Sequence, residues 1–270
     1  MFKISHEVPN CLLENSRIFN DYDYALVHLF KHNPTYFDFY KRQVEAGRRV
    51  ILDNSAYELG EPFNIKKYKE YIQLLEPTEY ILPDYRDDSK KNLQAIREWK
   101  CPYYDKALRR GGYIKLIGVV HGEDYDKFIQ NYRDISPYVD KIAISFETFF
   151  FNYSKTFNIT AAEARVQIIL RMCADGVIDL DKPHHILGAL SPTEYQAYVK
   201  YDWIETVDTS NPILHGILGQ RYSGEKGLLE KSREKLESYI NCNLDRDQLE
   251  DIYYNINWFR EQFYTNKLVL

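Results

Sequence analysis

The sequence predicts an α/β fold, a (β/α)8 TIM-type barrel with a C-terminal helical extension. Two observations favour this fold: short apolar runs alternate with amphipathic stretches, and from about residue 225 onward the pattern is purely helical. Strand and helix units in alternation form parallel sheets through right-handed crossovers. We therefore expect a barrel domain over 1–225 and a helical cap packed on it over 226–270, with a doubly wound open sheet as the alternative.

Seven apolar runs have the length and composition of buried strands. They cover 24–30, 49–53, 79–84, 114–121, 141–146, 184–190 and 203–208. A closed barrel needs an eighth strand, and the sequence leaves two places open for it: residues 2–4, or a short strand after Leu218.

The stretches between these runs have the apolar periodicity of helices. They cover 34–45, 65–75, 89–99, 125–134, 161–174 and 192–200. Several begin with a capping residue whose side chain can accept from the free N–H groups of the first turn, namely Asn64, Asp88, Thr160 and Ser191. Two further helices are expected in the C-terminal part, over 225–239 and 246–263.

The composition is that of an ordinary globular chain of 270 residues, with 44% apolar and 28% charged residues. It excludes a disordered, collagenous or coiled-coil protein. Lys and Arg number 35 against 40 Asp and Glu, so the net charge is −5 and a local basic patch would have to hold any nucleic acid. Neither a signal peptide nor an apolar stretch of membrane-spanning length is seen, so we expect a cytoplasmic protein without a membrane partner.

The cysteines, at positions 11, 101, 173 and 242, are widely scattered. They form no Cys-x-x-Cys pair, which argues against a zinc knuckle and against a small disulfide framework. Reduced thiols are the simplest interpretation.

Ionisable side chains follow five of the apolar runs, at the ends where a barrel gathers its chemistry. These residues are Asp53, Asp84, His121, Glu147 and Asp208. One aspartate after a strand is often only a turn former. Three carboxylates in one pocket, however, raise each other's pKa and destabilise the fold, so their presence together indicates a functional site. Two chemistries need such a ring: divalent metal binding, with His121 as a nitrogen ligand, and glycosyl transfer, with one carboxylate as nucleophile and another as acid/base. The two histidines inside a later run, His184 and His185, are expected to pack or cap.

Several segments, in order along the chain, resemble motifs of the tRNA-guanine transglycosylases. Residues 53–58, Asp-Asn-Ser-Ala-Tyr-Glu, are similar to the family's Asp-Ser-Gly-Gly-Phe-Gln loop, and 80–84 resembles its base-recognising Asp segment. Residues 118–122, Gly-Val-Val-His-Gly, parallel its Gly-Ile-Val-Gln-Gly, and 183–192 resembles its Pro-Arg-Tyr-Leu-Met-Gly-Val-Gly-Thr-Pro. Asp208 then stands four residues before a proline, which matches the spacing of the family's nucleophilic Asp and its following Pro.

The resemblance implies an enzyme that breaks the N-glycosidic bond of a guanine and installs a 7-deazaguanine base, and we expect no cofactor. It implies that Asp208 attacks the ribose C1′, that Asp53 is the general acid/base and that Asp84 grips the base edge. Tyr57 would stack on the base, and His121 would stand where a Gln donates to O6. An ionised carboxylate accepts only, which suits the adjacent N1–H and exocyclic N–H groups of guanine. Further substrate contacts are expected from Ser145, Phe146 and Glu147.

The chain also departs from that family. The Cys-x-Cys-x-x-Cys zinc region, which helps dock tRNA and form the dimer, has no counterpart, and Ser55-Ala56 replaces Gly-Gly in the first motif. A short zinc-free chain resembles the DNA-modifying transglycosylases of phages and bacteria. We therefore expect DNA as the polynucleotide, with tRNA second and the oligomeric state open. The basic residues expected to hold its backbone are Arg109, Arg110, Lys115, Arg221 and Lys226.

Two alternative functions remain open at this point. One is a nucleoside or deazapurine-nucleoside hydrolase on the same barrel, in which water resolves the intermediate on Asp208. The other is a non-catalytic nucleic-acid or base-binding module. The base-exchange hypothesis requires Asp53, Asp84 and Asp208 to lie around a single pocket.

Overall fold

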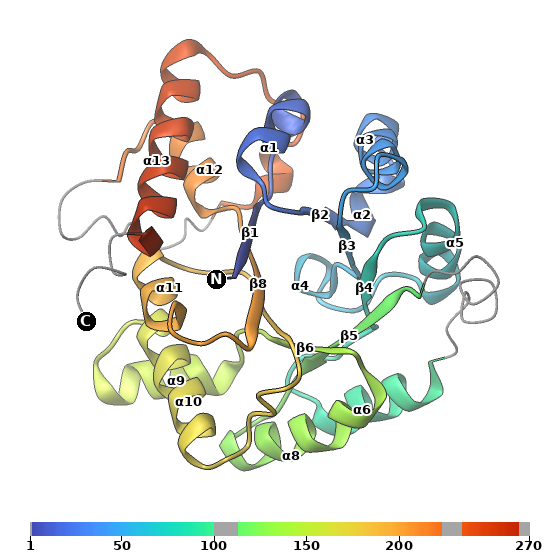
Figure 1. Cartoon of the computed structure of the whole chain (residues 1–270), viewed down its shortest axis with the longest axis vertical. Helices are drawn as coiled ribbons and strands as arrows, with labels where there is room; N and C mark the ends of the chain where they lie inside the picture. The colour runs from blue at the N-terminus through green and yellow to red at the C-terminus, as the bar shows by residue number, and fades with distance from the viewer. Residues whose placement is uncertain (1, 100–112, 223–233, 265–270) are drawn as a thin grey trace.

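A computed structural model describes residues 2–99, 113–222 and 234–264. Eight parallel strands form one sheet in the order β1-β8-β7-β6-β5-β4-β3-β2, and helices surround it (Figure 1). The two ends of this order, β1 and β2, lie next to each other, so the sheet curls into a nearly closed barrel. The predicted (β/α)8 fold is confirmed, and the open-sheet alternative is wrong.

The eight strands are short, and each pairs with its neighbours in the one sheet that forms the barrel. They are β1 (Lys3–His6), β2 (Asp23–Leu26), β3 (Val50–Asp53), β4 (Glu79–Ile81), β5 (Lys115–Val120), β6 (Lys141–Ile144), β7 (His184–Ile186) and β8 (Ile204–Thr209). The eighth strand is therefore the N-terminal β1, which pairs with β8 from Lys3 opposite Thr206 to His6 opposite Thr209.

Several apolar runs end as strands sooner than predicted, and in two of them the strand stops four residues early. In the run 24–30 the strand stops at Leu26 and Val27–Phe30 forms the helical turn α2. Here the backbone N–H groups donate to side chains instead of to a neighbouring strand. His28 N, for example, donates to Ser55 Oγ at 3.3 Å. In the run 184–190 the strand stops at Ile186, and Gly188 takes a positive φ of 58° that turns the chain into a loop.

The predicted helices are found at or near their expected bounds. They are α3 (Pro34–Glu45), α5 (Ile65–Leu75), α6 (Ser89–Glu98), α8 (Tyr125–Ile135), α10 (Ala161–Ala174), α11 (Pro192–Tyr198) and α13 (Arg246–Tyr264). The expected caps Asn64, Asp88 and Thr160 accept from backbone N–H groups in the first turn, whereas Ser191 makes no such bond. Helices that were not predicted are α1 (Leu13–Phe19), α4 (Ala56–Leu59), α9 (Thr148–Phe157) and α12 (Asn211–Ile217), with 3-10 turns η1 (Asn10–Leu12) and η2 (Ser136–Tyr138).

The helix predicted over 225–239 is not found in its described part. Residues 234–235 are not helical, and only the 3-10 turn η3 (Leu236–Tyr239) follows them. Tertiary contacts hold this segment: Lys235 Nζ donates to Glu58 O at 3.3 Å, and Glu237 lies 3.2 Å from His28 Nε2. The expected domain boundary at 225/226 lies outside the described residues.

The helix α13 packs on α12 and α11 beside the barrel. Gly216 makes this possible, because a Cβ there would lie 2.6 Å from the Cα of Ile252. The helix also reaches the seam between β1 and β2. There Asp21 N donates to Ile4 O and Ile4 N donates to Asp21 Oδ2, both at 2.9 Å, while Arg260 Nη2 donates to Asp21 Oδ1 at 2.7 Å.

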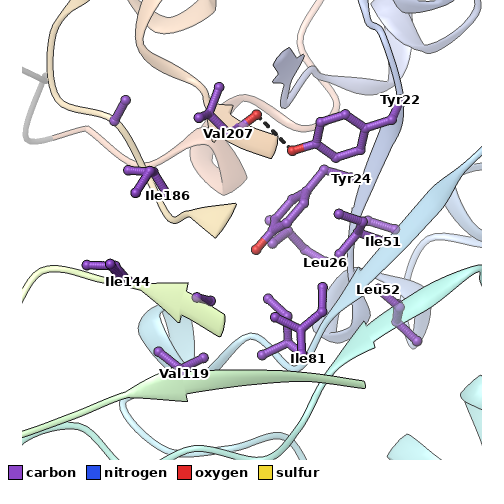
Figure 2. Packing of buried hydrophobic residues seen from close by; sticks show 14 of the residues in the cluster. Tyr22, Tyr24, Leu26, Ile51, Leu52, Ile81, Val119, Ile144, Ile186 and Val207 are labelled. Carbon is purple, nitrogen blue, oxygen red and sulfur yellow. Dashed lines mark hydrogen bonds between the residues drawn. The ribbon is translucent and has the colours of Figure 1, made fainter. Parts of the chain in front are cut away.

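Buried tyrosine hydroxyls donate to backbone carbonyl groups of the strands. Tyr22 Oη donates to Val207 O across the barrel at 2.7 Å (Figure 2), and Tyr68 Oη donates to Ile81 O at 2.7 Å. Each hydroxyl finds in this way the hydrogen-bond partner that a buried tyrosine needs. This use explains part of the 24 tyrosines in the sequence.

A charged cluster lies at the amino ends of the strands, opposite the site described below. Lys141 Nζ is 2.5 Å from Glu79 and 2.6 Å from Glu205, and Arg49 binds the same two carboxylates at 2.6 and 2.7 Å. Lys141 is fully buried, and burial lowers the pKa of its amine despite both partners. In barrels of this type, residues at the amino ends of the strands contribute to the stability of the fold, whereas the active site lies at the carboxyl ends.

Candidate active site

A cavity of about 740 Å³ opens at the carboxyl ends of the strands. Asp53 at the end of β3, Asp84 after β4 and Asp208 in β8 all line it, together with His121 after β5. The ends of parallel strands meet at one rim of a barrel, and this brings residues together that are far apart in sequence. The convergence that the base-exchange hypothesis requires is therefore present.

Asp53 is held by two donors at the edge of the cavity. Tyr24 Oη donates to Oδ2, and Ser55 N donates to Oδ1 at 2.6 Å from a left-handed turn with φ of 60°. Burial raises the pKa of Asp53 and these two bonds lower it, while the charges of Asp84 and Asp208 raise it further. The resulting pKa of about 7 lets Asp53 release or accept a proton near neutral pH.

Asp208 lies between the loop after β7 and a buried imidazole. Its Oδ1 accepts from Gly188 N at 3.1 Å and is 3.0 Å from His185 Nε2. His185 is fully buried, its Nδ1 is 2.9 Å from Thr206 Oγ1, and its ring stacks on Tyr24 with centroids 5.7 Å apart. The stack connects the side chains that contact the two carboxylates Asp53 and Asp208.

Asp84, His121 and Glu147 form a buried charged chain. His121 Nε2 is 2.5 Å from Asp84 Oδ2, and His121 Nδ1 is 2.8 Å from Glu147 Oε1. Burial alone would lower the pKa of His121, but the charge of Glu147 and hydrogen bonds to both carboxylates outweigh it and raise the pKa to about 10. His121 is therefore an imidazolium at neutral pH. The other oxygen of Asp84 accepts from Asn54 Nδ2 at 2.6 Å.

The charged contacts among Asp84, His121 and Glu147 change two of the expected roles. Both ring nitrogens of His121 face carboxylates, so the direct donation to O6 expected of His121 is not made in this arrangement. Glu147 is fully buried behind His121, so the expected direct substrate contact from Glu147 is not available either. A carboxylate at a strand end can point behind the cavity wall as well as into it.

Aromatic and small polar side chains complete the wall. Tyr57, in α4, lines the mouth and is 64% exposed. Phe146 and Ser145, after β6, line the opposite part, and Ser145 Oγ also donates to Glu147 Oε1 at 3.3 Å. The predicted positions of Tyr57, Ser145 and Phe146 at the cavity are therefore found.

The expected basic residues do not gather at the cavity. Lys115 is exposed at the amino end of β5, away from the mouth, and is not placed to hold a backbone whose base occupies the cavity. Arg221 is bound to Asp251 and lies 3.9 Å from Glu250, both in α13. The other three, Arg109, Arg110 and Lys226, lie outside the described residues.

The described rim of the cavity is more acidic than basic. Its acidic members are Glu7, Glu58, Glu61, Asp88, Glu234 and Glu237. Its basic members are Arg86, Lys91 and Lys235. Phosphate groups would need additional positive charge, and the segments 100–112 and 223–233, which border the described residues, contain seven Lys and Arg residues.

Sequence reasoning missed three contributors to this site. Tyr24 was noted only as the first residue of an apolar run and His185 was expected to pack or cap, although each contacts a candidate catalytic carboxylate. Asn54 was noted only within its motif, yet it fixes Asp84. An adjacent pair such as His184-His185 carries one usable signal, because successive strand side chains face opposite sides and one of the two must face the barrel interior.

Within the described ranges, no group of three or more His, Cys, Asp and Glu side chains is arranged to hold a metal ion. None of the helices there is suited by length and apolar character to crossing a membrane. Comparison with protein-family models and with curated proteins finds no match to this chain.

Proposed function

We propose that this protein is a base-exchange glycosyltransferase that replaces guanine in a polynucleotide with a 7-deazaguanine through a covalent bond between Asp208 and the ribose. One observation carries the proposal: three carboxylates from β3, β4 and β8 surround a single cavity whose volume, about 740 Å³, is in the range of small-molecule sites. Glycosyl transfer with retention needs a nucleophilic carboxylate and a second carboxyl group that moves a proton.

In the first step, an oxygen of Asp208 attacks C1′ as the C1′–N9 bond breaks, and its electron pair goes to the departing guanine. Asp53 supplies the proton that the leaving base needs. In the second step, Asp53 takes the N9 proton of the incoming base, whose N9 attacks C1′ and releases the Asp208 carboxylate. The pKa of about 7 suits Asp53 to both directions of proton transfer.

Recognition of the base falls to Asp84. Asn54 and His121 each hold one of its oxygens, and His121 keeps a positive charge against it. An ionised carboxylate fixed in this way presents its remaining lone pairs to adjacent N–H groups, as on the N1 and exocyclic amine edge of guanine. Tyr57 at the mouth and Phe146 in the wall offer ring faces for stacking, as enzymes that extrude a base require.

We propose DNA over tRNA as the polynucleotide, because the chain resembles the zinc-free enzymes and contains no Cys-x-Cys-x-x-Cys motif. The acidic rim favours one alternative, a hydrolase acting on a free nucleoside, which needs no phosphate contacts. The two functions differ in the acceptor of the ribose: an incoming base in exchange, and water in hydrolysis.

The test is to incubate the protein with radiolabelled guanine and either DNA or tRNA and to measure label in the polymer. Incorporation into DNA supports the proposal, whereas release of base from a nucleoside without incorporation into either polymer would establish the hydrolase.

A denaturing gel of protein, nucleic acid and competing base should show a covalent adduct. Asp208→Ala should abolish adduct and exchange, whereas the control Asp126→Ala, on the exposed face of α8, should keep both. If Asp208→Ala exchanges base at the wild-type rate, Asp208 is not the nucleophile. Base binding without any turnover in the wild type would indicate the non-catalytic module.

A further inference from the structure

Arg165 of α10 is a fully buried cation that does not line the cavity. Its Nε donates to Glu194 Oε1 at 2.5 Å, and its guanidinium lies 3.6 Å from the centre of the Phe146 ring. Burial of a guanidinium is costly unless its donors are used. The positions of those donors therefore indicate what the side chain holds in place.

The remaining donors of Arg165 bind the loop that follows β7. Nη1 donates to Leu187 O at 2.6 Å, and Nη2 lies 3.4 Å from Gly188 O. The peptide group that contains Leu187 O also contains Gly188 N, which donates to Asp208 Oδ1 at 3.1 Å. A single peptide unit thus lies between the guanidinium and the carboxylate, with its C=O toward the cation and its N–H toward the anion.

We propose that Arg165 is a positioning residue that acts on Asp208 through the Leu187–Gly188 peptide. A cation at the carbonyl oxygen draws electron density through the conjugated C–N bond, so the N–H becomes a stronger donor. The stronger bond fixes Oδ1 of Asp208 and stabilises its negative charge. The catalytic part of this inference rests on the proposed function, whereas the bonding of the peptide can be tested without it.

The same cluster holds both ends of the loop. Glu194, which pairs with Arg165, accepts from Leu190 N at 3.1 Å through its second oxygen. Glu194 Oε1 also accepts from Tyr198 Oη at 3.2 Å. Arg165 therefore connects α10, α11, the ring of Phe146 and the backbone donor to Asp208 in one buried unit, and Lys cannot reproduce its planar set of donors.

The experiment is NMR on protein labelled with [1-¹³C]leucine and [¹⁵N]glycine, in which only Leu–Gly peptide bonds give correlated signals. The chain contains three such bonds, at 59–60, 187–188 and 218–219. Asp208→Asn identifies the Gly188 amide by moving its proton signal. We expect Arg165→Met to move both the Leu187 carbonyl carbon and the Gly188 amide proton, the latter upfield, and to leave the other two pairs in place. The control is Arg171→Met, an exposed arginine on the same helix.

A shift of the Leu187 carbonyl carbon with an unchanged Gly188 amide proton would overturn the inference, because Arg165 would then hold the loop without influencing the donor to Asp208. Should Arg165→Met fail to fold, Arg165→Lys serves instead, with smaller shifts expected at the same two atoms. In the base-exchange assay we expect folded Arg165→Met to lower kcat about tenfold with a smaller change in KM. A wild-type kcat in this variant would also overturn the inference. If the wild type exchanges no base, the proposed function fails, but the NMR result still decides whether the peptide transmits the charge.

Discussion

Replacing His121 by glutamine tests the buried charged chain most directly. The change removes the cation that lies 2.5 Å from Asp84 and 2.8 Å from Glu147 and leaves two carboxylates close together. His121 and Glu147 are 2% and 0% exposed, so solvent does not screen the loss. Removing one partner of a buried ion pair costs about 3–5 kcal/mol. The rise in the pKa of His121 from 6.5 to about 10 corresponds to roughly 5 kcal/mol at 1.36 kcal/mol per pKa unit.

Urea unfolding of wild type and His121→Gln across pH 6–10 measures this contribution. The folded protein binds the His121 proton more tightly than the unfolded chain, so the stabilisation is complete below pH 6.5 and is lost as the pH rises toward about 10. The difference between the two proteins should therefore shrink at alkaline pH. The double variant with Glu147→Gln should recover part of the loss, because it deletes the unpaired buried charge. The control His32→Gln, at an exposed position, should unfold as the wild type does. Equal urea midpoints for wild type and His121→Gln at pH 6.5 would refute the reasoning.

Three further predictions concern other parts of the barrel. Lys141→Met removes one of the two cations that contact Glu79 and Glu205 while Arg49 keeps its contacts with both, and we expect a loss of about 1.5–3 kcal/mol in the free energy of unfolding by urea titration. Gly216→Ala should lower the melting temperature, because the new Cβ meets the backbone of α13; a higher melting temperature, the usual effect of alanine in a helix, would contradict that close packing. Tyr24→Phe removes a hydrogen bond that lowers the pKa of Asp53, so the limb of the pH profile of kcat/KM that needs ionised Asp53 should move to higher pH, and an unmoved limb would contradict this role.

The sequence predicted the ring of carboxylates because strand ends are visible in it. An apolar run that stops at an aspartate marks both the end of a parallel strand and the rim of a barrel. Asp53, Asp84 and Asp208 each follow this pattern, and all three line the cavity. The helices α3, α5 and α10 were found with their predicted bounds, because one apolar face and an N-terminal cap, Asn33, Asn64 and Thr160 respectively, specify them locally.

What the sequence could not provide is the direction of side chains that tertiary packing decides. Glu147 stands at a strand end as Asp84 does, yet it is buried behind His121. Arg165 lies on a helix whose sequence gives no sign that its guanidinium reaches the loop after β7. The run 24–30 is apolar throughout, and such a short run does not distinguish a strand from the strand and helical turn that form there.

The seam between β1 and β2 connects the first strand to the last helix. Asp21 bridges the two, since one of its oxygens accepts from Ile4 N and the other from Arg260 of α13. The other strand neighbours are joined by ladders of backbone bonds, whereas this junction depends on the side chains of Asn20 and Asp21 and on one backbone contact. Loss of α13 would remove the Arg260 contact with Asp21 while β1 stays paired with β8, and amide hydrogen exchange at Ile4, whose N–H donates to Asp21, would report on the docking of a helix more than 240 residues away.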